Sequence, residues 1–571
     1  MQKIILFLAC IILLVPVTRA QWDANPATVN NPVTTNPNGA IPFFSVIDGA
    51  GGAIVVWSGA DQAPTSFVYA QRKSSSGQVL WGTAATPKQL FTSAHNSYIT
   101  DLVEDGAGGA YITWVEQLTD TTSNVFIQHI NSSGTELFTA GGLRLNSANG
   151  QNNNFARVVS DAAGVIVAWT TADPDSIITV DYFAQVYVQR FTGAGAPQWT
   201  AGGVPVCTVP GQRHTPVLLG DGSNGVFIAF GDARNSTIDV IKNKFINVDI
   251  YAQHISSSGA RLWGAGGLVV TDQLYNQETL ISFFSNAHPI VSDGSGGFIV
   301  VYNDYRNDNN GKPRLYAQRL NSSGVQQWVA QGIALSTNPL TFTTGLPNLV
   351  VVSDGASGAV VAWNESLIFS GVEHAQRITG AGTLSWGTNG ITVNPATDIA
   401  TGAYMATDAN GDYIFCWSGI NFSNEAFVRA QKINNAGAPL WDAAGVPVCT
   451  NPDSGPIFPG IIKSDGTNMI LFWIDSRNVV NGNDNTDIYA AKLSTSGALI
   501  GTIAPAGYTT ANDGNWNDPA TWVGNAVPPV GVDVVVKHLV NGNLTTTCNT
   551  LKVQSPGSLT VNTGVKITVL H

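Results

Sequence analysis

The chain has 571 residues and a net charge of −12, with only 11% charged residues, 60 glycines and 3 methionines. This length exceeds one ordinary domain, although closed all-β repeats often reach it as a single unit. An acidic chain without clustered Lys or Arg argues against nucleic acid and anionic membranes as partners. The glycine-rich, charge-poor composition favours many short strands joined by turns.

The first twenty residues have the pattern of a secretory signal peptide. Lys3 gives the positive start, Ile4 to Val15 the apolar core, and Thr18-Arg19-Ala20 a small-x-small cleavage site. The apolar run is shorter than the ~20 residues of a membrane-spanning helix. We therefore expect residues 1–20 to be a signal peptide and the rest to be secreted, extracellular or at the cell surface, without membrane insertion.

An internal repeat dominates residues 21–507. An Asp-Gly-x-Gly-Gly phrase or a close variant, followed by an apolar run and an aromatic residue, occurs eight times, with successive aromatics 54 to 72 residues apart. The aromatics are Trp57, Trp114, Trp169, Phe230, Tyr302, Trp363, Trp417 and Trp473. Self-similarity at such a period is the signature of a repeat architecture.

A second phrase follows each copy, most clearly from Leu315 to Trp328, Leu-Tyr-Ala-Gln-Arg-Leu-Asn-Ser-Ser-Gly-Val-Gln-Gln-Trp. Seven copies place an aromatic four residues after the glycine: Trp81, Phe138, Trp199, Trp263, Trp328, Trp386 and Trp441. Each unit then holds four short strands, with Asp-Gly and Ser-Ser-Gly hairpin turns. Four antiparallel strands repeated eight times predict an all-β fold, an eight-bladed β-propeller over residues 21–507.

The eighth unit lacks its aromatic, because Gly501 stands where Trp is expected. The missing piece lies at the other end of the chain, where Gln21-Trp22-Asp23-Ala24 matches Leu440-Trp441-Asp442-Ala443. This alignment puts Val29 near the position of Val448. We expect Trp22 to about Val29 to form a strand beside Ile488–Leu493, completing the last blade and closing the ring.

The Tyr-Ala … Ser-Gly-x-x-x-Trp phrase resembles the tryptophan-docking motif of propellers in the pyrroloquinoline-quinone dehydrogenase superfamily, which are also eight-bladed. In those propellers the Trp packs between neighbouring blades, which implies the same packing for Trp81, Trp199, Trp263, Trp328, Trp386 and Trp441. The interval from Tyr to Trp is one residue longer here, Gln-Arg replaces Leu-Asp, and an adjacent Cys pair is missing. The resemblance therefore implies the architecture and not the quinone. A looser similarity to sialidase-type propellers lacks the spacing of their Asp-box.

Residues 508–571 change character. Asn515 to Trp522 leads to Pro528-Pro529 and then to short apolar runs such as Val534–Val536 and Leu559–Val561. This pattern resembles the opening of parallel β-helix or adhesin-like modules attached to large secreted bacterial proteins, some exported by type IX secretion. We expect a small C-terminal β module, which is either about one coil of a β-helix or a small β-sandwich.

Four cysteines follow the signal peptide: Cys207, Cys416, Cys449 and Cys548. Cys207 and Cys449 occupy the same position in repeats three and seven, on opposite sides of the predicted ring, and Cys416 and Cys449 have a strand between them. Because the Cα atoms of a disulfide lie within ~7 Å, we expect free, buried thiols.

A Gln followed by a base recurs in seven repeats. The pairs are Gln71-Arg72, Gln128-His129, Gln189-Arg190, Gln253-His254, Gln318-Arg319, Gln376-Arg377 and Gln431-Lys432, and Lys492 is the eighth base. The bases could form a ring of cations around an anionic ligand, or each could pair with an acid of its own blade, such as the Asp of the Asp-Gly turn. A feature repeated in every blade usually builds the blade, so we expect the second.

Asp-x-Arg-Asn follows the second strand in three repeats, where the two charges can pair and fix the loop, or where Arg can bind a carboxylated or sulfated sugar. Loops at this end of the ring vary in length, and variable loops on a rigid scaffold are where binding residues concentrate. Aromatic residues near repeats four and five add surface suited to sugars or proteins. The expected binding residues are Asp232, Arg234, Tyr275, Phe283, Phe284, Asp304, Tyr305, Arg306, Asp475 and Arg477.

No motif for a catalytic nucleophile, zinc site or phosphate loop occurs in the sequence. We expect a secreted, non-catalytic binding or scaffold propeller that recognises a glycan or protein outside the cell, as in adhesion, without a cofactor. Two alternatives stay open: a carbohydrate-active enzyme of the propeller type, either a sialidase-like hydrolase or a lyase, and a quinone- or metal-dependent oxidoreductase. Asn483 to Asp487 could suit calcium, with a polar turn as the competing interpretation.

Overall fold

The protein is described by a computed structural model. It covers residues 22–27, 31–36, 39–40, 43–60, 65–119, 122–146, 153–161, 163–171, 185–239, 244–279, 288–307, 312–340, 349–367, 370–421, 425–451, 455, 457–463, 468–479, 486–501, 508–523, 527–528, 534–548 and 550–569. The signal peptide, Phe283, Phe284 and most of the segment from Asn483 to Asp487 lie outside these residues.

The first four blades each consist of one antiparallel sheet. Blade 1 is β2 (Phe43–Ile47), β3 (Ala53–Ala60), β4 (Ser66–Lys73) and β5 (Lys88–Ser93). Blade 2 is β6 (Asn96–Glu104), β7 (Ala110–Thr119), β8 (Thr122–Ile130) and β9 (Leu143–Arg144). Blade 3 is β10 (Asn153–Asp161), β11 (Gly164–Thr171), β12 (Gln185–Thr192) and β13 (Val204–Pro205). Blade 4 is β14 (Arg213–Gly220), β15 (Val226–Asp232), β18 (Asp249–Ile255) and β19 (Leu268–Thr271), with a side hairpin of β16 (Thr237–Asp239) and β17 (Lys244–Ile246).

The other four blades follow the same plan. Blade 5 is β20 (Gln277–Glu278), β21 (Ile290–Ser292), β22 (Phe298–Asp304), β23 (Arg314–Leu320) and β24 (Ile333–Ala334). Blade 6 is β25 (Leu349–Ser353), β26 (Ala359–Leu367), β27 (Ser370–Ile378) and β28 (Ile391–Thr392). Blade 7 is β29 (Asp398–Thr407), β30 (Tyr413–Asn421), β31 (Ala426–Ile433) and β32 (Val446–Cys449). Blade 8 is β33 (Ile457–Lys463), β34 (Asn468–Asp475), β35 (Asp487–Ser494) and β1 (Pro32–Thr34).

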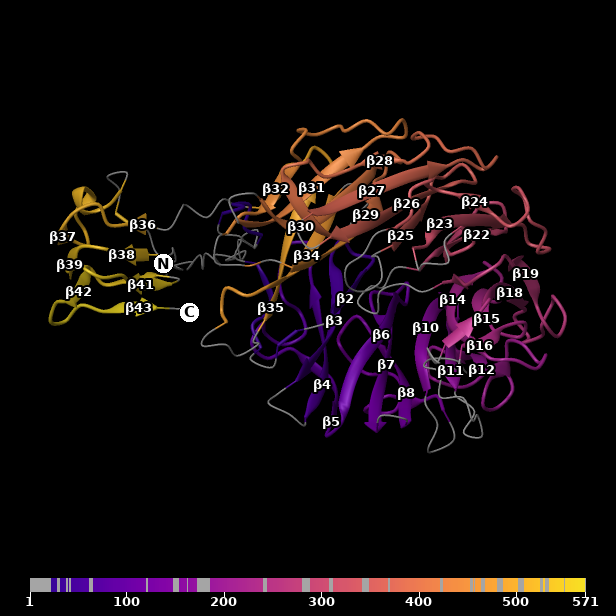
Figure 1. The fold of residues 1–571 in the computed structure, drawn as a ribbon. Coiled ribbons are helices and arrows are strands. Elements are labelled where there is room, and N and C mark those ends of the chain that lie inside the picture. The colour runs from indigo at the N-terminus through magenta and orange to yellow at the C-terminus, as the bar shows by residue number, and fades with distance from the viewer. Residues whose placement is uncertain are drawn as a thin grey trace, which may run out of the picture.

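The first strand of each blade lies innermost and contacts the first strand of the next blade. The contacts run β2, β6, β10, β14, β21, β25, β29, β33 and back to β2, which closes the circle. Figure 1 shows the blade sheets arranged around this ring. The predicted eight-bladed β-propeller is therefore confirmed, and its edges are mostly short outer strands, as a closed ring allows.

Each blade docks onto the next through an aromatic ring. The ring lies on a turn glycine of the following blade, so close that a Cβ there would meet it at 2.8 to 3.1 Å. The pairs are Gly77 with Trp22, Gly134 with Trp81, Gly195 with Phe138, Gly259 with Trp199, Gly324 with Trp263, Gly382 with Trp328, Gly437 with Trp386 and Gly497 with Trp441. Six of the indoles also donate to a carbonyl of that turn, for example Trp199 Nε1 to Ser257 O at 2.9 Å.

The repeated glutamine holds the docking aromatic in place. In blade 6 the Gln376 Oε1 accepts from the backbone of Arg377 at 3.0 Å and of Trp386 at 3.1 Å, and its Nε2 donates to Gly387 O at 2.6 Å. Five other glutamines also accept from the backbone amides of the following base and of the docking aromatic: Gln71, Gln128, Gln189, Gln253 and Gln431. Gln318 accepts from the amide of Arg319 and donates to Val329 O. Blade 8 has Ala491 at this position. Its docking ring comes from Trp22, so a glutamine there would have no following Trp to hold.

The base after each glutamine pairs with the Asp of its own blade's turn, as predicted from the repeat. The pairs are Arg72–Asp48 at 3.0 Å, His129–Asp105 at 3.0 Å, Arg190–Asp161 at 2.6 Å, His254–Asp221 at 2.8 Å, Arg319–Asp293 at 2.9 Å, Arg377–Asp354 at 2.9 Å and Lys432–Asp408 at 2.7 Å. The Lys492 Nζ instead donates to backbone carbonyls of blade 1. These charges build the blades and link them.

The N-terminal segment completes blade 8, but with a different strand from the one predicted. Trp22 is 2% exposed and docks on blade 1, as expected. The strand beside β35 is β1, with Pro32 opposite Tyr489, so Val33 and not Val29 takes the place of Val448. Four extra residues separate Trp22 from this strand, and an alignment without gaps cannot show them.

The C-terminal strands form three parallel sheets to one side of the ring (Figure 1). They are β36 (Tyr508–Thr509), β37 (Gly514–Asn515), β38 (Val534–Val536), β39 (Leu539–Gly542), β40 (Thr546–Cys548), β41 (Leu551–Val553), β42 (Ser558–Val561) and β43 (Ile567–Val569), with a 3-10 helix, η1 (Pro519–Thr521). Parallel pairing of β36–β38–β41 and β37–β39–β42 is the arrangement of a β-helix and excludes the sandwich alternative. The chain makes more turns than the single coil predicted.

The four cysteines are buried and form no disulfide among the described residues, as the repeat positions predict. In the described part of the chain, no helix is long and apolar enough to cross a membrane.

Candidate binding site

The innermost strands are irregular at one shared level. Their pairing with the second strand shifts opposite the repeated aromatic in blades 2, 3, 4, 7 and 8. In blade 5 the irregularity is longer, since β20 and β21 both pair with β22 and residues 279–289 lie between them. Bulges often redirect side chains at the rim of closed β-structures. In this propeller the bulges change which side chains line the centre of the ring. They lie near the end of the ring that carries the long loops.

Three bulge residues have a positive φ: Phe155 at 51°, Thr215 at 41° and Gly402 at 76°. Glycine tolerates this conformation, but an aromatic and a β-branched residue do so at a cost of order 1–3 kcal/mol. The surrounding sheet must offset that cost. Such strain is concentrated at functional sites more often than elsewhere, which directs attention to this level of the ring.

A contact between non-adjacent blades occurs at this level. His288, in the insertion of blade 5, has its Nε2 3.2 Å from Asp101 Oδ1 of blade 2. Asp101 is 0% exposed and also accepts from the backbone of Leu102 at 2.9 Å and of Val158 at 2.8 Å. Blades 3 and 4 lie between blades 2 and 5, so this contact spans the inner side of the ring. The carboxylate thereby joins blades 2, 3 and 5.

Arg157 lies beside this carboxylate. Its Nη1 donates to Thr100 O of blade 2 at 2.9 Å. Burial lowers the pKa of the guanidinium, and the charge of Asp101 opposes that shift. Asp101 and Arg157 thus form a buried pair of opposite charges at the junction of two bulges, where each charge helps to offset the desolvation of the other.

A small pocket opens next to the pair and is lined by Tyr98, Ile99, Thr100, Asn154, Phe155, Ala156 and Arg157. The Tyr98 hydroxyl donates to Asn154 Oδ1 at 2.8 Å. We call Tyr98, Asp101, Asn154, Arg157 and His288 the axial cluster. It brings together a phenol, an amide, an imidazole, a buried carboxylate and a buried guanidinium. These groups can hydrogen-bond hydroxyls and stack on an apolar ring face, which suits a polar organic ligand.

The Asp-x-Arg residues form the ion pairs that the sequence suggests. The closest oxygen–nitrogen distances are 2.6 Å for Asp232–Arg234, 2.5 Å for Asp304–Arg306 and 2.6 Å for Asp475–Arg477. Each guanidinium also stacks on a tyrosine of the third strand, at 3.7 Å from Tyr251, 4.1 Å from Tyr316 and 4.0 Å from Tyr489. Burial disfavours the charge of Arg234, but bonding to Asp232 outweighs it and raises the pKa. Their ligand-binding role stays a prediction.

The two predicted aromatic residues that the structure describes are both half-buried. Tyr275 has a φ of 67° and its backbone amide donates to Asn247 Oδ1 at 2.8 Å. Burial, with the nearby charge of Glu278, raises the pKa of Tyr305. Both residues come from blades 4 and 5, at the loop end of the ring. Neither residue lines the small pocket of Tyr98 and Asn154.

Sequence reasoning missed the axial cluster because none of its residues belongs to a repeated phrase. The available signal was polarity in an inner strand. Asp101 is followed by Leu102-Val103 and Arg157 by Val158-Val159, and an unpaired charge next to such apolar residues in an inner strand would be costly. Among the described residues, no three His, Cys, Asp or Glu side chains gather as metal ligands would.

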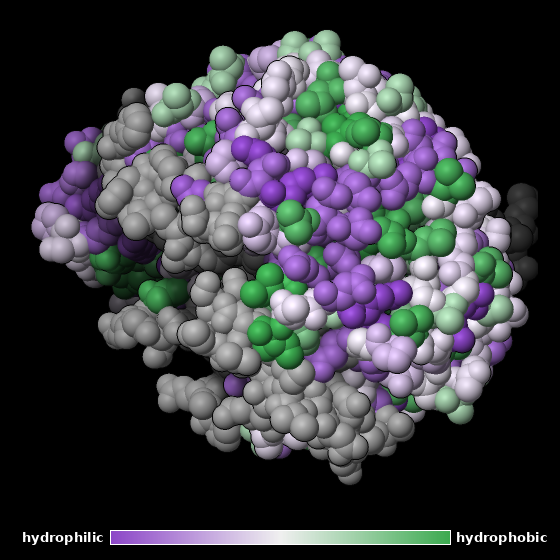
Figure 2. All heavy atoms as spheres, turned by 45° about the vertical axis from the view of Figure 1, so that its right-hand side comes forward, coloured by the Kyte–Doolittle hydropathy of each residue, from purple (hydrophilic) through white to green (hydrophobic). Residues whose placement is uncertain are grey.

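Figure 2 shows one side of the molecule with hydrophilic residues in a broad band and hydrophobic residues in separate small groups. Exposed apolar side chains are likewise scattered along the described chain, including Leu262 at 53%, Leu274 at 71% and Val329 at 65% exposure. On this side, the described residues form no single large apolar patch of the kind that marks many protein interfaces.

No protein-family model matches the chain, and no curated protein matches it. Similar solved structures include a polysaccharide lyase, an ulvan lyase bound to a sulfated oligosaccharide, with 11% identity over 82% of this chain and 96% of that chain and a TM-score of 0.43. A protein of unknown function from Dyadobacter fermentans has 12% identity over 60% and 94%, with a TM-score of 0.34. An α-L-arabinanase from Penicillium chrysogenum has 9% identity over 80% and 96%, with a TM-score of 0.32. Likenesses this distant carry no argument about a site.

Proposed function

We propose that this chain is a secreted, glycan-binding propeller whose ligand contacts the axial cluster. The observation that carries the proposal is the Asp101–His288 contact, which joins blades 2 and 5 beside the pocket of Tyr98 and Asn154. Polar and aromatic groups from several blades converge on one point, as in sites for polar ligands. The blades themselves are a scaffold, since their repeated charges are paired.

The loop residues near blades 4 and 5 would form the rim of the same face. Tyr275 and Tyr305 offer aromatic surface, and the Asp-x-Arg pairs hold their loops in place. Secretion follows from the signal peptide expected in residues 1–20. The docking motif's resemblance to quinone dehydrogenase propellers is proposed for the architecture alone, and an adhesin-like role is proposed for the C-terminal coils.

Binding to an immobilised glycan array tests this function, with Tyr98→Ala and His288→Ala as axial variants and Tyr275→Ala as a rim variant. We expect the wild type to bind a subset of glycans and the axial variants to lose at least tenfold in affinity, with an unchanged fold by circular dichroism. The rim variant should lose less. Absence of glycan binding by the wild type, or full binding by both axial variants, would contradict the proposal.

A carbohydrate-active enzyme is the second candidate, because one observation favours it. Asp101 orients the His288 imidazole through Nε2, while Nδ1 has no hydrogen-bond partner in the described residues. A carboxylate that fixes one imidazole nitrogen is the usual arrangement of a general base. Hydrolase and lyase assays on the preparation used for binding would decide. Turnover that His288→Gln abolishes while glycan binding persists would establish catalysis.

A further inference from the structure

The joint between blade 8 and blade 1, where the ring closes, differs from the other seven joints. One difference is Lys73, the last residue of β4. In the other seven blades the residue at this position is apolar: Ile130, Phe191, Ile255, Leu320, Ile378, Ile433 and Leu493. Lys73 is nevertheless 3% exposed, so blade 1 buries a lysine where its sister blades bury a hydrocarbon.

The second difference is Asn31, the residue before β1. Six other blades have an aliphatic residue at the equivalent place: Leu143, Val204, Leu268, Ile333, Ile391 and Val446. In three joints that side chain covers the turn glycine of the next blade, as Leu268 covers Gly324. Asn31 turns instead to the backbone of Asp23, with bonds of 2.7 and 3.1 Å. The filling side chain is therefore missing at this joint.

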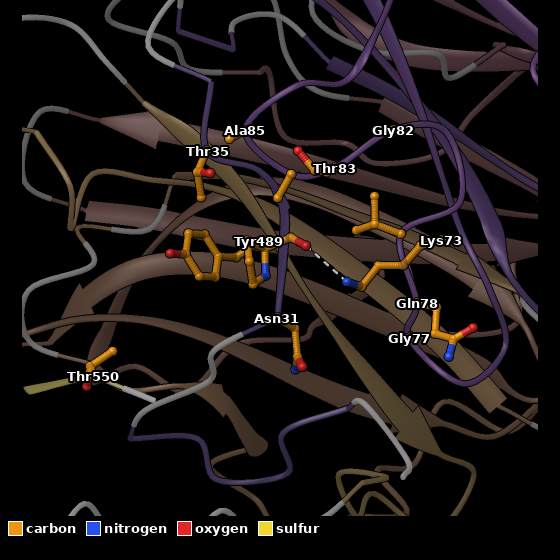
Figure 3. Close-up of a pocket in the computed structure, with 13 residues that line it drawn as sticks. Asn31, Thr35, Lys73, Gly77, Gln78, Gly82, Thr83, Ala85, Tyr489 and Thr550 are labelled. Carbon is orange, nitrogen blue, oxygen red and sulfur yellow. Dashed lines mark hydrogen bonds between the residues drawn. The ribbon is translucent and has the colours of Figure 1, made fainter. Parts of the chain in front are cut away.

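A pocket of about 1110 Å³ lies at this joint. Its lining comes from β1 and its flanks, from β35, from the end of β4 through the following turn, and from Thr550 of the C-terminal coils, and includes Thr35, Lys73, Gln78 and Tyr489. Figure 3 shows Lys73 extending among these residues, with its Nζ donating to the Pro32 carbonyl at 3.0 Å. The volume is slightly above the range of roughly 300–1,000 Å³ that is usual for small-ligand sites.

Lys73 has no carboxylate within ion-pair distance among the described residues, and its Nζ lies 5.3 Å from the Trp22 ring centroid. Burial lowers the pKa of the amine to about 7. The ionisable groups on the elements packed around it are Asp23, Tyr489 and Lys492, and the Lys492 Nζ donates to the carbonyls of Gly51 and Ser75. Asp48 already forms an ion pair with Arg72. A positive charge at Lys73 thus lacks a counter-charge from the protein.

We propose that this joint pocket binds an acidic sugar, with the sugar carboxylate on the Lys73 Nζ and its hydroxyls on Thr35 and Gln78. The sugar carboxylate would supply the negative charge that Lys73 lacks within the protein. Charge-assisted hydrogen bonds are stronger than hydrogen bonds between neutral groups. Neighbouring hydroxyl and amide side chains suit a polyhydroxylated ring. The site is separate from the axial cluster and does not depend on the function proposed for that cluster.

Isothermal titration calorimetry with galacturonate and with galactose tests the proposal, since the two sugars differ in the carboxylate. The wild type should bind galacturonate and not galactose. Lys73→Met should lose at least tenfold in affinity while staying folded, because the other blades have apolar residues there. Lys88→Met, which removes a cation of the same blade that pairs with Glu136 at 2.9 Å, should bind like the wild type. Equal affinity for the two sugars, or undiminished binding by Lys73→Met, would overturn the proposal.

A second readout follows from the proton balance. Above pH 7 the carboxylate must draw a proton onto Lys73, so binding should take up nearly one proton per ligand at pH 8.5 and weaken by about tenfold per pH unit. Titrations in buffers of different ionisation enthalpy measure this uptake. Lys73→Arg should bind without it, because arginine stays protonated. Proton uptake unchanged in Lys73→Arg, or acetate binding as tightly as galacturonate, would contradict the acidic-sugar site.

Discussion

The turn glycine beneath each docking ring serves two purposes. Gly382 has a φ of 82°, which disfavours other residues, and a Cβ there would lie 2.9 Å from Trp328. Gly355 has a similar φ of 71°, but a Cβ there would meet no atom within 4 Å. The two glycines share the conformational requirement and differ in the contact. They therefore allow the cost of the contact to be measured separately.

We expect Gly355→Ala to cost about 1 kcal/mol for the left-handed backbone alone. Gly382→Ala should cost about 1–3 kcal/mol more, because a Cβ there would meet Ile333 Cδ1 at 2.7 Å and the Trp328 ring at 2.9 Å, and both must move from a packed joint. Chemical denaturation of both variants checks this. If the two variants lose equal free energy of unfolding, the ring contact contributes nothing and the docking account is wrong.

The sequence allowed the docking ring and the turn glycine to be predicted separately, but not their contact. The resemblance to quinone-dehydrogenase propellers implied that the Trp residues pack between blades, and the turn phrases predicted that glycine supplies the positive φ. The docking aromatic of one blade contacts the turn glycine of the next blade because the blades are arranged in a closed circle. No local sequence pattern predicts that arrangement. The pairs between the turn Asp and the base after the glutamine were easier to predict, because an acid and a base recur in every unit.

At the scale of the element, β27 carries an exception to its own repeat. Glu373 occupies the place of an aliphatic residue such as Val68 or Leu315 in the sister strands and is 2% exposed. Asn364 Nδ2 donates to one carboxyl oxygen at 2.7 Å, and the other oxygen has no partner in the described residues. Burial raises the pKa of Glu373 to about 8, against the opposing effect of the Asn364 bond.

This raised pKa makes stability depend on pH. Between the ordinary pKa of 4.5 and about 8 the folded protein keeps a proton that the unfolded chain releases. The free energy of unfolding should therefore fall as pH rises from 5 to 7, by up to about 1.4 kcal/mol per pH unit. Lys73 does not interfere, since it is largely protonated in both states over most of this range. Glu373→Gln should flatten the profile; a slope equal to that of the wild type would refute the assignment.

The inner strands show why the candidate site was harder to predict than the fold. Aromatic spacing and turn phrases are local, so the blades and their order could be predicted from the repeat. The bulges opposite Trp114 and Trp169 depend on how two strands pair, and the Asp101–His288 contact joins residues 187 apart in the chain. The contact of His288 with blade 2 follows only from the closed ring.

At the scale of the whole molecule, the N-terminal segment ties three blades together. Pro26 O accepts from Thr450 N of blade 7 at 2.8 Å, and β1 pairs with β35 of blade 8. Thr35 N donates to Ala84 O of blade 1 at 2.9 Å. Closing the ring through strands from both ends of the propeller fixes all eight blades at once. The axial cluster depends on this closure, because its residues come from three blades.

A cross-link shows directly whether β1 of the same chain closes blade 8. Thr34 and Ile488 are cross-strand partners, and opposed antiparallel residues lie at the Cα separation that a disulfide requires. We expect the Thr34→Cys/Ile488→Cys variant, oxidised in solution, to form an intramolecular disulfide in a monomer, detected by mass spectrometry of peptides from non-reduced protein. Thiols that stay free, or a disulfide that links two chains, would contradict the account.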